Sequence, residues 1–127
     1  LGGNPVSRAA GLAVLDYIES HHLADNAAAR GEQLRAGLRE IQKKHPIIGD
    51  IRGLGLMTGA EFVHADKSPA AAELDDVLET LKDRGFIIGK NGIARNVMAF
   101  QPPLVITAED IDNVLNAIEM VLTEKKL

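Results

Sequence analysis

The sequence has no cysteine and no tryptophan, and it has few aromatic residues of any kind. Without cysteine, the chain cannot form a disulfide, a thiolate metal site or a cysteine nucleophile. Aromatic residues make up 3% of the chain and apolar residues 46%, so a core must be built from leucine, isoleucine, valine and alanine. The lack of cysteine fits a reducing compartment, and we expect a cytoplasmic protein.

The sequence also lacks an excess of positive charge and lacks long apolar runs. Lys and Arg number 14 against 18 Asp and Glu, which gives a formal net charge of −4. Nucleic-acid surfaces neutralise phosphates with Lys and Arg, so this balance argues against such a partner. No window approaches about 18 unbroken apolar residues, the length of a candidate membrane span. The first residues match neither a signal peptide nor a transit peptide, and we expect no membrane partner.

The most regular pattern lies between positions 49 and 63. From Leu54 onward, apolar and small residues alternate with period two, which predicts one strand whose buried face carries Leu54, Leu56, Ala60 and Phe62. Glycines on the opposite face let another backbone approach closely, with a bend near Gly53. A phosphate cradle is excluded, because the spacing is G-x-G-x-x-x-G and no helix follows it directly.

Helical spacing marks four other segments. Helices are predicted over 6–18, over 24–44, from Ser68-Pro69 to just before Gly85, and from the capping box at Thr107 onward. The buried stripe of the second helix is expected to be Gly31, Leu34, Leu38 and Ile41. Short strands are predicted at 86–88 and 97–101. This order predicts an α+β fold, a small and mainly antiparallel sheet covered by about four helices.

The residues themselves show no catalytic constellation. There is no G-x-S-x-G elbow, no Walker loop, and no isolated pair of carboxylates in an apolar setting. Histidine spacing predicts no metal site. Arg52, beside the buried strand, is expected to hold carbonyls or a carboxylate, with ligand contact as the alternative. The segment Gly89–Asn96 is rich in Gly and Asn, and it is expected to be a loop that could border a binding site.

Three ordered motifs resemble those of class III aminotransferases, the ω-amino-acid type of pyridoxal phosphate enzymes. They are Gly2–Val6 followed by the small-residue stretch Gly11–Leu15, the stretch Ile48–Glu61, and Gln101–Thr107. The resemblance covers essentially the whole chain, which matches the C-terminal part of such an enzyme. It implies one small domain of fold type I over 1–127, with 1–22 as an interdomain or interface helix and 24–127 as the small domain proper.

The resemblance also implies a reaction. The parent would use pyridoxal 5′-phosphate to move an amino group from an amine or ω-amino acid to a 2-oxo acid, as a homodimer with shared active sites. The catalytic lysine would lie before Leu1, so no residue here is assigned a catalytic role, and the fragment alone is expected to be inactive. Gly2 and Gly3 are the expected neighbours of the cofactor phosphate, because backbone N–H groups approach an anion where side chains are absent.

The same resemblance points to the substrate positions. Many members carry an arginine a few residues before Pro102-Pro103 that grips a substrate carboxylate bidentately, and the matching position here is Ala99. Arg95 lies about 13 Å earlier along an extended strand, so it could replace that arginine only if the loop took another path. We take Ala99 and Arg95 as candidate substrate-binding positions. The alternative is a stand-alone α+β ligand-binding or dimerisation module.

Overall fold

The computed structural model describes residues 13, 16, 17, 19 and 22–127. The elements of this part are α2 (Leu23–Lys44), β1 (Ile48–Leu54), β2 (Met57–Phe62), α3 (Ala71–Asp83), β3 (Gly89–Asn91), β4 (Val97–Phe100) and α4 (Ala108–Glu124). The strands form one sheet in the order β1-β2-β4-β3, and every neighbouring pair is antiparallel. The predicted α+β fold with a small antiparallel sheet is therefore confirmed. The helix expected over 6–18 lies mostly outside the described residues.

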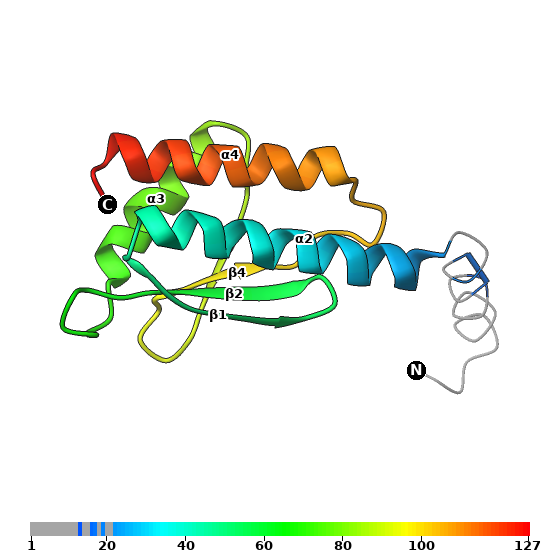
Figure 1. The fold of residues 1–127 in the computed structure, drawn as a ribbon, viewed down its shortest axis with the longest axis horizontal. Helices are drawn as coiled ribbons and strands as arrows, with labels where there is room; N and C mark the ends of the chain where they lie inside the picture. Colours follow the sequence, from blue (N-terminus) through cyan, green and yellow to red (C-terminus); the bar gives the residue numbers. More distant parts are fainter. Residues whose placement is uncertain (1–12, 14–15, 18, 20–21) are drawn as a thin grey trace.

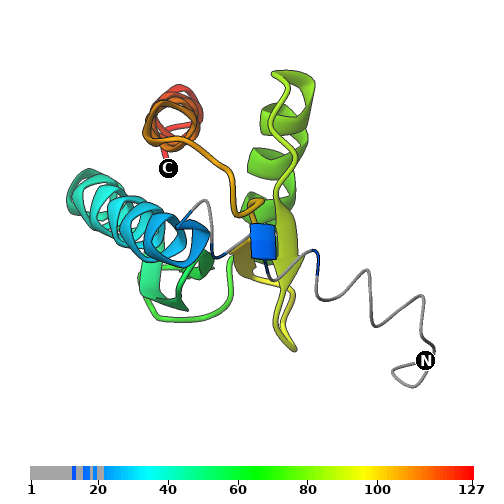
Figure 2. The ribbon, with the colours of Figure 1, turned by 90° about the vertical axis from the view of Figure 1, so that its right-hand side faces the viewer.

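The described helices cover one face of the sheet. Burial alternates along β2 and β4, so that one face of each strand is buried and the other is at least partly exposed. Figure 1 shows α2 and α4 side by side on the same side of the sheet, and Figure 2 shows that they stay on that side after a quarter turn. A sheet with one covered face reads as alternating apolar and polar positions, which is the pattern seen here.

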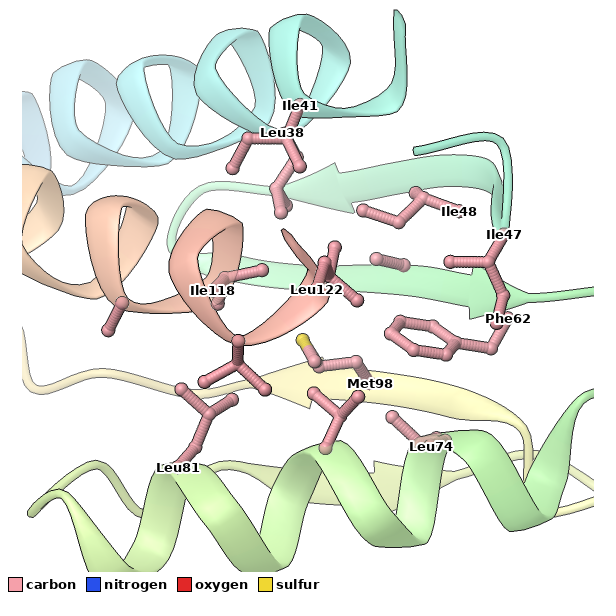
Figure 3. Packing of buried hydrophobic residues seen from close by; sticks show 14 of the residues in the cluster. Leu38, Ile41, Ile47, Ile48, Phe62, Leu74, Leu81, Met98, Ile118 and Leu122 are labelled. Carbon is pink, nitrogen blue, oxygen red and sulfur yellow. The ribbon is translucent and has the colours of Figure 1, made fainter. Parts of the chain in front are cut away.

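The core fills the space between the helices and the covered face of the sheet (Figure 3). The stripe predicted for α2 is confirmed, since Gly31, Leu34, Leu38 and Ile41 are all buried. The largest fully buried side chains are Phe62, Leu34, Leu38, Ile48, Leu74, Leu81, Met98, Ile111, Ile118, Leu122, Val77 and Val121. Two buried phenylalanines, Phe62 and Phe100, lie among aliphatic residues in this core, as expected for a chain so poor in aromatic residues.

The pattern between positions 49 and 63 forms two strands, so the prediction of a single strand was wrong. β1 ends at Leu54 and β2 begins at Met57, and these two residues pair across a two-residue turn. Gly55 in this turn has a φ of +58°, which favours glycine. Leu54 shares a face with Met57 and is 87% exposed, whereas Leu56, Ala60 and Phe62 are buried as expected.

Two element boundaries also differ from the predictions. Ser68 does not cap α3, because its hydroxyl and its N–H both donate to Asp66 Oδ1, and these bonds lower the pKa of Asp66. α3 begins later, at Ala71, without a side-chain cap. The strand expected at 86–88 is displaced to Gly89–Asn91, while the capping box of Thr107 and Asp110 is confirmed.

α2 lies directly against the β1–β2 turn, but the glycine that allows this is Gly31 of the helix and not a glycine of the 49–63 stretch, since a Cβ on Gly55 would meet nothing within 4 Å. A Cβ built on Gly31 would lie 1.8 Å from the carbonyl oxygen of Gly55. Arg35, one turn further along α2, donates from its Nη1 to the same oxygen at 2.8 Å. Glycine at position 31 therefore lets the turn lie directly against the helix.

Replacing Gly31 by alanine should destabilise the fold, because two backbone segments would have to separate. We expect the free energy of unfolding to fall by about 1–3 kcal/mol, the usual cost of overpacking, as measured by chemical denaturation. Gly37→Ala on the same helix is the control, since its new Cβ would meet only the flexible end of Leu115, at 2.3 Å. Equal losses in the two variants would contradict the role of the Gly31–Gly55 contact.

Candidate functional site

The sheet face that points away from the described helices is called the open face. Strand pairing places on it Arg52, Leu54, Met57, Gly59, Glu61, Gly89, Asn91, Val97 and Ala99. Two of its apolar side chains, Leu54 and Met57, are 87% and 60% exposed. The stretch from 49 to 63 and the segment that carries Ala99 therefore meet on a surface that no described helix covers.

Ala99 lies in a row of small residues that crosses the open face. Its partner on β2 is Gly59 and its partner on β3 is Gly89. Arg52 of β1, which pairs with Gly59, extends the row to the fourth strand. Over three strands the largest side chain in the row is one methyl group, so another molecule or domain can lie close to the backbone there.

Arg52 closes one end of this row. Its Nη1 donates to Asp50 Oδ2 at 2.8 Å, which agrees with the expectation that it holds a carboxylate. Both side chains are more than half exposed, at 66% and 57%. An exposed ion pair of this kind contributes little to stability, so the guanidinium can exchange Asp50 for another anion at small cost.

The structure does not bring Arg95 to Ala99. Arg95 lies in the loop that joins β3 to β4, before the strand that carries Ala99, and its φ of +57° is left-handed. Its N–H donates to the carbonyl of Gly92 at 3.1 Å, which closes the loop on itself. The roles of Arg95 and Ala99 toward a substrate remain predictions, and Gly2 and Gly3 lie outside the described residues.

The chain leaves β4 through residues Gln101–Ile106, called the exit segment. It has no regular secondary structure, and Pro102 and Pro103 contribute no N–H groups. The side chain of Asn26 on α2 donates to two of its carbonyls, at 2.9 Å to Leu104 and at 3.0 Å to Ile106. Sequence reasoning missed Asn26, because no local pattern links it to residues 78 and 80 positions away.

A cleft of about 950 Å³ lies between the exit segment, β3 and α4. Two cations at its rim are engaged: Lys90 with Asp75 at 2.6 Å, and Arg84 with Glu124. The hydrogen bond from Arg84 lowers the pKa of Glu124. Apolar lining comes from Phe86, Ile87 and residues of α4, and Ala99 borders the cleft where it meets the sheet.

Two features are absent from the part of the chain that the structure describes. None of its helices has both the length and the apolar character needed to cross a membrane. It also contains no group of three or more His, Cys, Asp or Glu side chains placed to hold a metal ion.

A family profile described as aminotransferase class-III matches residues 1–122. The chain belongs to the class-III aminotransferase family. Curated relatives include alanine–glyoxylate aminotransferase 2 homolog 2 of Arabidopsis thaliana, mitochondrial, 45% identical over 93% of this chain and 25% of its own length. Another is the 5-aminovalerate aminotransferase DavT of Pseudomonas putida, 44% identical over 96% of this chain and 29% of its own length.

Solved structures of this family share the fold. A phospholyase from Arthrobacter in complex with phosphoethanolamine has a TM-score of 0.90 at 36% identity, over 95% of this chain and 29% of its own. A Bacillus anthracis aminotransferase has a TM-score of 0.88 at 35% identity, over 96% of this chain and 29% of its own. The chain thus spans between a quarter and a third of the relatives it matches.

The family implies pyridoxal phosphate, so the described residues can be tested for it. The cofactor needs a lysine amine for covalent attachment. The strands carry one lysine among their described residues, Lys90, which pairs with Met98 of the covered face and donates to Asp75. Among the described residues, the strands therefore place no lysine on the open face.

A bulky cation should be tolerated at position 99 and not at position 60, because the two alanines face opposite sides of the sheet. Ala99→Arg should change the free energy of unfolding by less than about 0.5 kcal/mol, as a surface substitution does. Ala60→Arg is the comparison, since Ala60 is 0% exposed and pairs with Met98, and it should prevent folding. Thermal unfolding followed by circular dichroism measures both, and a large loss in Ala99→Arg would contradict the assignment of the open face.

Proposed function

We propose that the parent protein is a pyridoxal-phosphate-dependent transaminase that moves an amino group from an amine or ω-amino acid to a 2-oxo acid. The observation that carries this proposal is the family match over residues 1–122. In it, residues 1–127 are the C-terminal small domain, with 1–22 as an interface helix and 24–127 as the domain itself. The parent is a cytoplasmic homodimer, and this chain alone is inactive.

In this proposal the open face is one wall of the substrate site. When bound, pyridoxal phosphate supplies the chemistry that loosens bonds at the amine-bearing carbon. The residues of this chain shape the space beside it. Gly59, Ala99 and Gly89 keep the wall flat, and the exposed Leu54 and Met57 give it an apolar margin that excludes water.

Position 99 bears on the choice of substrate. A methyl group there cannot make the paired hydrogen bonds with which a guanidinium holds a carboxylate. Arg95 lies in the loop before β4, at the opposite end of that strand from the exit segment, so it could take this role only if the loop took another path. At position 99 the wall therefore favours an uncharged part of the substrate. This agrees better with an amine or an ω-amino acid than with an α-amino acid bound through its α-carboxylate.

A second candidate is a lyase that removes phosphate from a phosphorylated amine. The neighbour with a TM-score of 0.90 is a phospholyase holding phosphoethanolamine, a compound without a carboxylate. Ala99 is compatible with such a substrate, because a substrate without a carboxylate needs no guanidinium at this position. The two candidates share the cofactor and differ in the bond of the substrate that is broken. The transaminase breaks the carbon–nitrogen bond of the amine, whereas the lyase breaks the carbon–oxygen bond to the phosphate.

The parent, expressed with its upstream region, should be yellow from bound cofactor, whereas residues 1–127 alone should be colourless and inactive. Turnover of an amine with pyruvate or 2-oxoglutarate would support the transaminase, and release of inorganic phosphate from phosphoethanolamine would support the lyase. A colourless parent without either activity would favour the stand-alone binding or dimerisation module.

Restoring the arginine should move the preference of the parent toward carboxylate substrates. In Ala99→Arg we expect kcat/KM for an α-amino acid to rise by about tenfold relative to an amine, since one charge-assisted pair contributes about 1.5–3 kcal/mol before its costs. Ala99→Leu adds bulk without charge and serves as the control. If both variants lose activity equally toward the two substrates, position 99 does not discriminate between them.

A further inference from the structure

We propose that Asn26 is a positioning residue, which sets the path of the exit segment and through it the affinity of the parent for its substrate. The inference rests on the proposed function, in which Ala99 lies in the wall of the substrate site; the exit segment begins two residues after it. Asn26 lies near the start of α2, and neither its position nor its neighbours resemble a catalytic motif. What marks it is the pair of carbonyls that its amide nitrogen reaches.

The two hydrogen bonds have good geometry and bind one short stretch of chain. Asn26 Nδ2 donates to the carbonyl of Leu104 at 2.9 Å and to that of Ile106 at 3.0 Å. Both distances are typical for N–H···O bonds. A single carboxamide thus satisfies two carbonyls two residues apart and holds the stretch between them at a set distance from α2.

The exit segment needs such a support, because its own backbone offers little. It pairs with no strand, and Pro102 and Pro103 remove two donors. Its internal bond runs from the N–H of Ile106 to the carbonyl of Pro103, at 3.0 Å. Leu104 and Val105 are 39% and 55% exposed, so packing holds them weakly.

The two ends of the segment are anchored independently. Phe100, just before it, pairs with Thr58 in the sheet. Thr107, just after it, forms the capping box with Asp110. Between these anchors, among the described residues, the side chain of Asn26 ties the segment laterally to the rest of the domain.

The helix that carries Asn26 is packed against the domain. Leu23 and Ala27, on either side of Asn26 along α2, are buried against the domain. α2 also packs along α4 and β1. An error of about 1 Å in the placement of a group at a substrate site can cost up to about a hundredfold in rate, so fastening the segment to a packed helix matters for function.

The test compares Asn26→Ala with Gln33→Ala in the full-length parent loaded with cofactor. Gln33 is a matched control, since it also lies on α2 and also donates two hydrogen bonds, to Ala108 O and to Asp112 Oδ1. Those bonds hold the start of α4, beyond the exit segment. Asn26→Asp is a second variant of the same size, in which an oxygen replaces the donating nitrogen.

Two readouts separate positioning from general stability. In Asn26→Ala we expect the backbone amide of Ile106, which donates to Pro103, to exchange with deuterium about tenfold faster, because the local opening of the exit segment becomes easier. We expect KM to rise about five- to tenfold with kcat within about twofold, since binding and not the chemical step loses support. Asn26→Asp should behave alike, while Gln33→Ala should change exchange only at the start of α4.

The outcomes are distinct. If the Asn26 variants show faster exchange with an unchanged KM, or if Gln33→Ala raises KM equally, the positioning role is wrong. Unchanged exchange in the Asn26 variants overturns the fastening itself, whatever the activity. A wild-type parent that neither transfers amino groups nor releases phosphate overturns the proposed function, and the exchange data still decide whether Asn26 holds the segment.

Discussion

The close contact between α2 and the β1–β2 turn is the constraint on which the rest of the domain depends. Gly31 has no Cβ, so the carbonyl of Gly55 can lie against the helix, and Arg35 donates to that carbonyl and to Thr58 Oγ1. Because the turn lies so near to α2, β1 and β2 bring their apolar face under the helix. The core of aliphatic residues then closes between α2, α4 and the sheet.

This arrangement has a consequence for function. All described helices lie on one face, so the opposite face, with its row of Gly59, Ala99 and Gly89, is left without a helical cover. In the proposed parent that bare wall borders the substrate, while polar side chains on α2 hold the backbone around it. Asn26, Gln33 and Arg35 each bind carbonyls of a different segment. One helix therefore supports both the core and the rim of the candidate site.

Some predictions from sequence held because their causes are local. The buried stripe of α2 follows from the helical period, and the Thr107 capping box needs residues only three positions apart. The β1–β2 turn was missed, because Leu54 and Leu56 continue the alternation that a single strand would show. The prediction of a strand at 86–88 was wrong for another reason. Phe86 and Ile88 pack against the core without strand pairing, and whether a segment pairs depends on a partner strand elsewhere in the chain.

By itself, the sequence determined the fold class, the order of most elements and the family. These depend on composition, on short-range periodicity and on motifs that are contiguous in the chain. Only the tertiary structure decided that Ala99 lies between two glycines on the open face, that Arg95 stays apart from it, and that Asn26 holds the exit segment. Those facts depend on strand register and on hydrogen bonds between residues up to 80 positions apart, which no local pattern encodes.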